Sequence, residues 1–274
     1  MKTMKFEIGD IPVSNDEPLF VIGGPCVLES ESQALQVGKE LKRITEKLDI
    51  GYIFKSSFDK ANRSSVDSYR GPGLEQGLEI LERVRTELEV PVLTDIHTPD
   101  QAAPAGEVVD VLQIPAFLSR QTDLIVEAAR TGNPLHVKKG QFISPEGMSN
   151  VVEKAASAGN EQVMLCERGA MFGYNNLVVD MRNLEVMKSN DQPVVFDCTH
   201  SVQRPGARGD SSGGDREFAF PLARAAAAVG VAGLFMEAHP DPPSAKCDAA
   251  TQLPLEDVEP MLETLVSIDE QIKH

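Results

Sequence analysis

The chain has 274 residues, of which 26 are lysine or arginine and 42 are aspartate or glutamate, so its formal net charge is -16. On average this charge repels nucleic-acid backbones and anionic membranes, and we expect neither as a partner. The four cysteines show no CxxC spacing and are few for this length, which argues against a disulfide framework.

The N-terminal segment is predicted to be a short extension of the main domain. Residues 5–13 alternate weakly around Gly9-Asp10, which is typical of a small β-hairpin. They lack the apolar core of a signal peptide, and no apolar stretch in the chain approaches the roughly 18 residues that cross a bilayer. We therefore expect a cytoplasmic protein with a single domain over residues 1–274, in which residues 1–18 form an N-terminal extension or hairpin and residues 19–274 form the main body.

Eight short apolar runs follow, and each stops at a polar or charged residue. The runs are 19–22 before Cys26, 52–54 before Lys55, 92–93 before Asp95, 108–112 before Gln113, 135–137 before Lys138, 163–166 before Glu167 and Arg168, 194–196 before Asp197, and 234–236 before Glu237. Helix-like stretches lie at 31–48, 74–88, 99–105, 121–131, 145–158, 177–188, 216–229 and 254–271. This alternation predicts an α/β fold with a parallel sheet, and eight units close a (β/α) TIM barrel of about 250 residues. The strand ends of such a barrel meet on one face, so the polar stops are predicted to share one site.

Two long loops are predicted over that face, at residues 60–73 and 201–215. The second loop is rich in glycine and is expected to be mobile.

Cys26, His200, Glu237 and Asp248 form the first candidate cluster. Cys26 follows the first strand, Glu237 is predicted to close the eighth, and these strands are neighbours in a closed barrel. A thiolate, an imidazole and two carboxylates suit a divalent ion such as Zn, Fe, Mn or Co. Spacing alone also permits purely structural roles for the four residues. The residues nearby that compete as ligands are His239 and Cys247, and Asp197 is predicted only to support His200.

The second candidate cluster is cationic and consists of Lys55, Lys60, Arg63, Lys138, Lys139 and Arg168. Cations gathered in a barrel mouth are costly unless an anion joins them, so a phosphorylated substrate is predicted. The alternative is a set of solvated loop charges balanced by Asp59, Asp95 and Glu167. A desolvated Lys138 would instead suit a Schiff base.

Longer motifs surround both clusters. They are Gly24–Ser30, Phe54–Ser65, Gly71-Pro72-Gly73, Thr94–His97, Leu112–Leu118, Lys138–Gln141, Cys166–Gly169, Asp197–Gln203 and Glu237–Pro240. Spanning nearly the whole chain, they resemble the 3-deoxy-D-manno-octulosonate 8-phosphate synthases, a family of eight-stranded barrels. The resemblance implies a transferase that condenses phosphoenolpyruvate with D-arabinose 5-phosphate and water, a step toward lipopolysaccharide precursors.

Two alternatives to this reaction remain open. The related 3-deoxy-D-arabino-heptulosonate 7-phosphate synthases use erythrose 4-phosphate and typically carry Lys-Pro-Arg-Thr where this chain reads Lys60-Ala61-Asn62-Arg63-Ser64. That difference favours arabinose 5-phosphate. A catalytically silent sugar-phosphate binding protein is the alternative from another class.

The resemblance also implies roles for individual residues. Lys60, Lys138 and Arg168 would bind the phosphate and carboxylate of phosphoenolpyruvate. The residues that would line that pocket are Lys55, Gln113 and Ala116, and those that would hold the arabinose phosphate are Asn62, Arg63 and Ser64. Arg120 would come from a neighbouring subunit of a homotetramer, whose interface would include Phe117 and Leu118. The implied catalytic residues are Lys60, Asp95, Lys138 and His200.

The metal-dependent members of the family carry cysteine at the position of Cys26, where metal-independent members carry asparagine. The resemblance therefore implies a metal-dependent enzyme whose ligands are Cys26, His200, Glu237 and Asp248. One segment is mixed: residues 245–248 resemble the metal-independent type, whereas residues 248–252 resemble the dependent type. The identity of the ion is left open.

Overall fold

A closed barrel of eight parallel strands forms the centre of the molecule. The computed structural model describes residues 4–63, 65–172, 176–205 and 213–273. The barrel strands are β3 (Phe20–Gly24), β4 (Tyr52–Lys55), β5 (Val92–Asp95), β6 (Val111–Ile114), β7 (Leu135–Lys138), β8 (Val163–Glu167), β11 (Val194–Asp197) and β14 (Gly233–His239). Each pairs with its neighbour in this order, and β14 closes the ring by pairing with β3. The predicted TIM barrel is confirmed.

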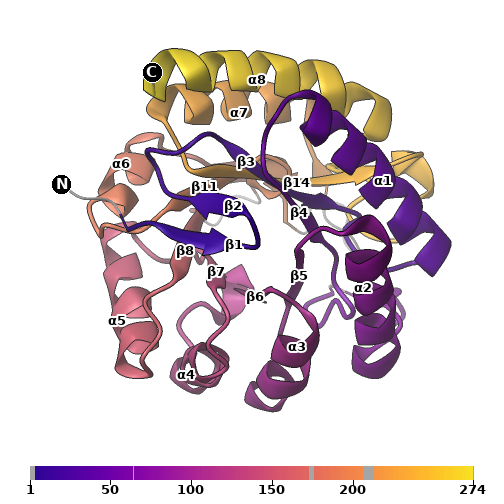
Figure 1. Cartoon of the computed structure of the whole chain (residues 1–274), viewed down its shortest axis with the longest axis horizontal. Helices are drawn as coiled ribbons and strands as arrows, with labels where there is room; N and C mark the ends of the chain where they lie inside the picture. The colour runs from indigo at the N-terminus through magenta and orange to yellow at the C-terminus, as the bar shows by residue number, and fades with distance from the viewer. Residues whose placement is uncertain (1–3, 64, 173–175, 206–212, 274) are drawn as a thin grey trace.

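Helices surround the barrel (Figure 1). They are α1 (Glu31–Lys47), α2 (Leu74–Leu88), α3 (Ala102–Val108), α4 (Thr122–Arg130), α5 (Ser149–Ser157), α6 (Arg182–Lys188), α7 (Ala219–Val229) and α8 (Val258–Lys273). Ser30 starts α1 because its hydroxyl accepts a hydrogen bond from the Gln33 amide at 3.2 Å. The apolar faces of the helices pack on the outward side chains of the strands, and together these form the larger apolar core.

The predicted hairpin is present and seals one end of the barrel. Strands β1 (Phe6–Ile8) and β2 (Ile11–Val13) pair antiparallel and lie across the barrel axis (Figure 1). Their apolar side chains pack with Phe20, Ile53 and other inward residues near the strand starts. We call this apolar layer the barrel floor and the opposite, C-terminal end of the strands the barrel mouth.

Several predicted boundaries differ from the structure. The fourth strand begins at Val111 rather than 108, because α3 extends to Val108. The predicted helix 177–188 begins at Arg182, because Leu177–Val178 (β10) pairs with Ala170–Met171 (β9). Residues 216–218 form a 3-10 turn ahead of α7.

The eighth strand does not close at Glu237, as predicted, but continues to His239. Its last two residues pair with Leu253–Pro254 (β15), which is why the helix predicted to begin at 254 begins at Val258. The strand thus extends beyond the barrel wall and anchors the loop that carries Asp248.

Of the two predicted loops, residues 60–73 contain no helix or strand among those described. The second loop begins with a 3-10 turn (His200–Val202) and a short pair of strands, β12 (Gln203–Arg204) and β13 (Gly213–Gly214). Residues 206–212 and Ser64 lie outside the described residues, so the predicted mobility of this loop stays a prediction.

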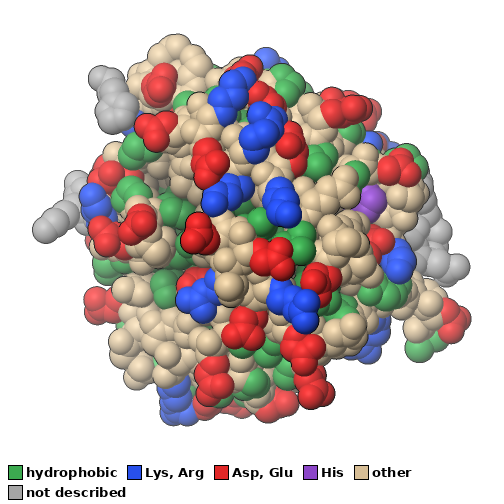
Figure 2. Space-filling model, turned by 45° about the vertical axis from the view of Figure 1, so that its right-hand side comes forward, with side chains coloured by type: hydrophobic (Ala, Val, Ile, Leu, Met, Phe, Trp, Pro, Cys, Tyr) green, Lys and Arg blue, Asp and Glu red, His purple; other side chains and the backbone are tan. Residues whose placement is uncertain are grey.

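The outer surface mixes charges of both signs. Figure 2 shows acidic and basic side chains interspersed over one face. Lys47, for example, contacts Glu259 at 2.5 Å and Glu263 at 2.9 Å, which links α1 to α8. In the part of the chain that is described, no helix is both long and apolar enough to span a membrane.

Candidate active site at the barrel mouth

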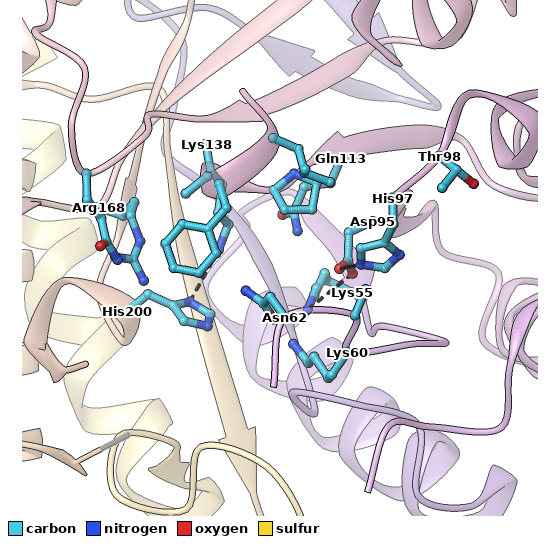
Figure 3. A pocket seen from close by; sticks show the side chains of 16 residues that line it. Lys55, Lys60, Asn62, Asp95, His97, Thr98, Gln113, Lys138, Arg168 and His200 are labelled. Atoms are coloured by element: carbon cyan, nitrogen blue, oxygen red, sulfur yellow. Dashed lines mark hydrogen bonds and ion pairs between the residues drawn. The ribbon is translucent and has the colours of Figure 1, made fainter. Parts of the chain in front are cut away.

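A pocket of about 300 Å³ opens at the barrel mouth, as the strand order requires. Figure 3 shows side chains from opposite sides of the barrel converging on it. The predicted site residues that line it are Lys55, Lys60, Asn62, Asp95, Gln113, Ala116, Lys138, Arg168 and His200. Other residues that line it, none of which was predicted to belong to the pocket, are Ala61, His97, Thr98, Pro115, Phe117, Leu118 and Gln141; Phe117 and Leu118 had been expected at a subunit interface.

Arg168 brings an unsatisfied cation to the pocket. It is only 5% exposed, and one of its terminal nitrogens donates to Gln203 at 2.7 Å. The Nε and Nη1 atoms are buried without a hydrogen-bond partner. Burial lowers the pKa of the guanidinium. A buried guanidinium with free donors fits a phosphate or carboxylate, which it binds with two parallel hydrogen bonds.

Lys138 lies at the centre of the mouth on an aromatic platform. Its Nζ is 3.4 Å from the ring centroid of Phe235 and 2.5 Å from Asp197 Oδ2. Burial opposes charge on Asp197, but His200 and Lys138 outweigh it and hold the pKa of this carboxyl well below its ordinary value. Nζ of Lys138 is thus engaged in an ion pair, which argues against the alternative role as a Schiff-base nucleophile.

Asp197 also orients His200. Its Oδ2 accepts from Nδ1 of His200 at 2.8 Å, and its Oδ1 accepts from the backbone amide of the same residue, also at 2.8 Å. The other ring nitrogen, Nε2, then faces Glu237 at 3.5 Å and Asp248 at 3.7 Å. Carboxylates commonly fix the tautomer and orientation of a metal-binding histidine in this way. The geometry agrees with the expected supporting role of Asp197.

Lys139, the next residue along the chain, faces away from the pocket. Its side chain is fully buried, and Nζ lies 3.4 Å from Glu167 and 3.4 Å from the carbonyl oxygens of Ile143 and Gly169. Successive side chains of a strand point to opposite faces, so only one of the two adjacent lysines can enter the barrel mouth. Of the cationic cluster, Lys139 therefore belongs to the outer wall.

Lys55 and Lys60 connect the two sides of the mouth. Nζ of Lys55 lies 3.2 Å from Glu237 and 3.9 Å from Asp95, and Nζ of Lys60 lies 3.8 Å from Glu237. Burial would lower the pKa of Lys60, but Cys26 and Glu237 outweigh it and raise that pKa well above its ordinary value. Lys60 thus stays charged beside the pocket.

Asp95 is held as a carboxylate between Lys55 and His97. Burial favours its neutral form, yet Lys55 and His97 lower its pKa well below the ordinary value. His97 Nε2 is 3.2 Å from Asp95 Oδ2, and the ring packs edge-on against Phe58. His97 is a pocket residue that strand-end reasoning missed, because it lies two residues past the strand.

Gln113 is oriented from below by His136. The imidazole Nδ1 lies 3.0 Å from Gln113 Oε1, and the ring stacks on Phe235 with an interplanar angle of 11°. Burial lowers the pKa of His136 to about 3, with Lys138 adding to the effect, so the ring is neutral at pH 7. Its Nδ1–H therefore donates to the amide oxygen of Gln113, which leaves the amide NH₂ for the pocket.

The candidate metal ligands form two triads that share Asp248. One triad consists of Cys26, Cys247 and Asp248, and the other of His200, Glu237 and Asp248; within each, the ligand atoms lie within 4.8 Å of one another. Burial opposes charge on Asp248, but His200 lowers its pKa below the ordinary value. Burial raises the pKa of the Cys26 thiol, and Cys247 raises it further.

These donors fit a divalent transition ion. Glu237 Oε2 is fully buried and has no hydrogen-bond partner, although His200 lies 3.5 Å away. A buried carboxylate oxygen of this kind needs a partner, and sulfur, imidazole and carboxylate ligands together suit Zn, Fe, Mn or Co. His239, in contrast, is engaged elsewhere: its Nε2 contacts Gln33 at 2.6 Å.

Backbone geometry fixes the positions of two candidate ligands, Cys26 and Asp248. Just before Cys26, β3 and β4 approach so closely that a Cβ at Gly24 would lie 2.0 Å from the carbonyl oxygen of Lys55, so only glycine fits there. Asp248 has a φ of 47°, in the left-handed region that few side chains other than Asp and Asn adopt readily. Such strained positions concentrate at functional sites.

Three residues predicted to bind the sugar phosphate do not all meet in the pocket. Asn62 lines it, whereas Arg63 donates to Cys247 Sγ at 2.9 Å and to the Lys246 carbonyl at 3.1 Å. Ser64 lies outside the described residues. Arg120 is exposed and lines a separate hollow, so its role toward a neighbouring subunit stays a prediction.

The fold and the site define a class: a TIM-barrel protein whose mouth gathers buried cations beside a set of candidate metal-ligand side chains. The chain belongs to the DAHP synthetase I family, whose model matches residues 3–274. It is 57% identical over 259 residues to a 2-dehydro-3-deoxyphosphooctonate aldolase of Desulfotalea psychrophila, covering 94% of this chain and 92% of that protein. Proteins of that name from Hahella chejuensis and Shewanella amazonensis are 53% and 51% identical over 273 residues, each covering 100% of this chain and 97% of theirs. The resemblance inferred from the motifs is confirmed.

Proposed function

We propose that this chain condenses phosphoenolpyruvate with D-arabinose 5-phosphate and water to form 3-deoxy-D-manno-octulosonate 8-phosphate and inorganic phosphate, a step in lipopolysaccharide precursor biosynthesis. The observation that carries the proposal is Arg168, a buried guanidinium with two unpartnered nitrogens in a pocket shared with three lysines. Two anionic substrates are the natural occupants of such a pocket. Full-length relatives named for this product support the choice of reaction.

In this proposal Lys60, Lys138 and Arg168 bind the phosphate and carboxylate of phosphoenolpyruvate. Their charges are fixed before the substrate arrives, so they stabilise charge that develops in the transition state without reorganisation. Lys55 and Gln113 line the same pocket, with the Gln113 amide held by His136. The reaction breaks the C–O bond of phosphoenolpyruvate, water supplies the oxygen that remains on the product, and the phosphate leaves.

The aldehyde substrate would lie between Asp95 and the predicted sugar-phosphate residues. Asp95 is ionised beside Lys55 and can accept a hydrogen bond from a sugar hydroxyl or relay a proton. Asn62, Arg63 and Ser64 are proposed to hold the distal phosphate. Because Arg63 contacts the Cys247 segment in this structure, binding the phosphate requires its guanidinium to turn toward the mouth.

Cys26, His200, Glu237 and Asp248 are proposed to hold a divalent ion. When bound, such an ion supplies a Lewis acid that polarises an oxygen of water or aldehyde. The chain's own contribution is orientation, since Asp197 fixes the His200 tautomer and Lys55 holds Glu237 at 3.2 Å.

We also propose that the protein is a homotetramer. Exposed Phe117 and Phe142 near the exposed Arg120 support this proposal, because exposed apolar side chains often mark an interface. Light scattering tests it, and we expect a molar mass equal to that of four chains. A cytoplasmic location is proposed because all four cysteines are free, as expected in a reducing compartment.

The test is phosphate release with each aldose phosphate, with and without a chelator. We expect turnover with arabinose 5-phosphate, little with erythrose 4-phosphate, and loss of turnover after metal removal that added metal restores. Preference for erythrose 4-phosphate would favour heptulosonate synthesis, and no phosphate release with either would favour a binding protein. Full turnover of metal-free protein in chelator would contradict the metal-dependent mechanism alone.

A further inference from the structure

Two cysteines face one another beside the candidate metal ligands. Sγ of Cys26 lies 2.8 Å from Sγ of Cys247 and 3.4 Å from Asp248 Oδ2. Both thiols are buried, at 0% and 2% exposure, and neither forms a disulfide. The three ligand atoms lie within 4.8 Å of one another, a spacing that one ion can span.

We propose that Cys247 is a second thiolate ligand of the metal centre, in addition to Cys26, His200, Glu237 and Asp248. The inference rests on the metal-dependent part of the proposed function. Cys247 precedes Asp248 directly in the chain, so one loop contributes both ligands. Because Asp248 belongs to both triads, an ion bound to its carboxylate lies within reach of the thiolate pair as well as of the His200 triad.

Gln252 holds the two cysteines together. Its Oε1 accepts from the backbone amide of Cys26 at 3.3 Å, and its Nε2 donates to the carbonyl oxygen of Cys247 at 2.7 Å. Gln252 is only 1% exposed, so these hydrogen bonds are shielded from water. One side chain thus fixes the relative position of two segments that are 221 residues apart in sequence. Such preorganisation is expected of two side chains that bind the same metal ion, whereas two cysteines that only fill the core do not require it.

Arg63 supplies the matching charge. Its Nη1 donates to Sγ of Cys247 at 2.9 Å, and its Nη2 donates to the Lys246 carbonyl at 3.1 Å. This contact places a positive charge directly beside the sulfur atom of the proposed ligand. The same contact holds residues 246–247 against the mouth, so the loop presents both Cys247 and Asp248.

A second thiolate changes which ion the site prefers. Thiolates favour Zn and other soft ions over Mn, whereas carboxylates and water suit Mn. Cys247→Ser is therefore expected to shift the selectivity of the site toward Mn and to weaken Zn binding by at least about tenfold, as ligand-shell changes typically do.

The test uses cobalt as a spectroscopic probe that counts sulfur ligands. Purified, reduced and metal-stripped protein is loaded with one equivalent of Co(II), and the near-ultraviolet thiolate-to-cobalt absorption is measured per bound ion. We expect Cys26→Ser and Cys247→Ser each to reduce this absorption about twofold. Cys166→Ser, which changes a buried cysteine that belongs to neither ligand triad, serves as the matched control and is expected to leave the absorption unchanged.

Wild-type intensity in Cys247→Ser, at full cobalt occupancy, would overturn the proposal. Because a variant can fail to fold, X-ray absorption of the wild-type zinc protein gives an independent answer: two sulfur neighbours at about 2.3 Å support the proposal, and one excludes it. Neither measurement depends on turnover. The reaction itself is tested separately by phosphate release, so failure of the ligand assignment and failure of the proposed function are distinguishable.

Discussion

The floor and the mouth of the barrel differ in what they bury. The floor is filled by apolar side chains such as Phe20, Ile53 and Val195, covered by the N-terminal hairpin. The mouth, along the same strands, buries charged groups that include Lys55, Asp197 and others. A buried ion pair usually stabilises a fold no more than apolar residues of the same size do. The burial of charged groups at the mouth is therefore best explained by ligand binding, whereas the apolar floor contributes to the stability of the fold.

The largest expected effect is the difference between substituting Lys138 and substituting Lys139, two adjacent lysines that are both in buried ion pairs. Lys138→Met removes a cation from the mouth and is expected to lower kcat/KM about 10³-fold, as loss of one preorganised charge does. Lys139→Met leaves the buried Glu167 in the barrel wall without its ion-pair partner. We expect this change to lower the free energy of unfolding by about 3–5 kcal/mol, whereas kcat/KM stays close to wild type. Phosphate release and denaturant unfolding measure the two effects. Equal loss of turnover in both variants would show that the mouth and wall are not separate.

A smaller effect is expected at the boundary between mouth and floor. Phe235→Leu removes the ring on which Lys138 rests at 3.4 Å, and a desolvated cation–π contact contributes up to about 2 kcal/mol. We expect kcat/KM to fall about tenfold. Phe20→Leu makes the same chemical change in the floor and is the control.

Both Phe variants are expected to lose about 1 kcal/mol of unfolding free energy, because each removes similar volume from the barrel interior. Only Phe235→Leu is expected to lose turnover. If Phe20→Leu loses turnover to the same extent, Phe235 acts through general packing rather than through Lys138.

The smallest predicted effect is a pH dependence of stability. His136 has a pKa of about 3 in the folded chain, against about 6.5 when unfolded. As pH falls below about 6.5 the unfolded chain binds a proton that the folded chain does not, so the free energy of unfolding falls by up to about 1.4 kcal/mol per pH unit. Unfolding measured from pH 6.5 to 5 avoids the buried carboxylates, whose lowered pKa values act at more acidic pH.

His136→Gln keeps a donor for Gln113 but cannot titrate, and we expect it to remove that part of the acid-side slope. A slope identical to wild type in this variant would mean that His136 is protonated in the folded chain.

The strands and their order were predictable because a buried parallel strand is short, apolar and ends at a polar residue. All eight runs correspond to barrel strands, and five of the polar residues at their ends line one pocket, namely Lys55, Asp95, Gln113, Lys138 and Arg168. Boundaries were less accurate where tertiary pairing decides them: β15 extends β14 past Glu237, and β10 replaces the start of a predicted helix. Neither pairing leaves a periodic signal in the sequence.

The site was harder to predict than the strands, because its make-up depends on the direction in which each side chain points. Lys138 and Lys139 differ only in the face of the strand that each occupies, and strand alternation could have separated them. Arg63 and Cys247 are 184 residues apart, and no local pattern indicates their contact. Phe235 is an apolar residue in an apolar run, so nothing marks it as the support for Lys138. The sequence therefore indicates where chemistry occurs better than it indicates what holds it in place.

The N-terminal hairpin has a consequence for the order of folding. Residues on either side of it bind to the start of β11 and the segment before it: the Met4 amide donates to the Asp191 carbonyl at 2.7 Å, and Asn15 bonds to Gln192 at 2.9 Å and to Val194 at 2.8 Å. These contacts span more than 170 residues, so the hairpin segment lacks these docking partners until most of the barrel has been synthesised. Until then the apolar face of the hairpin and the uncovered barrel floor are both exposed, and their association with other chains must be prevented.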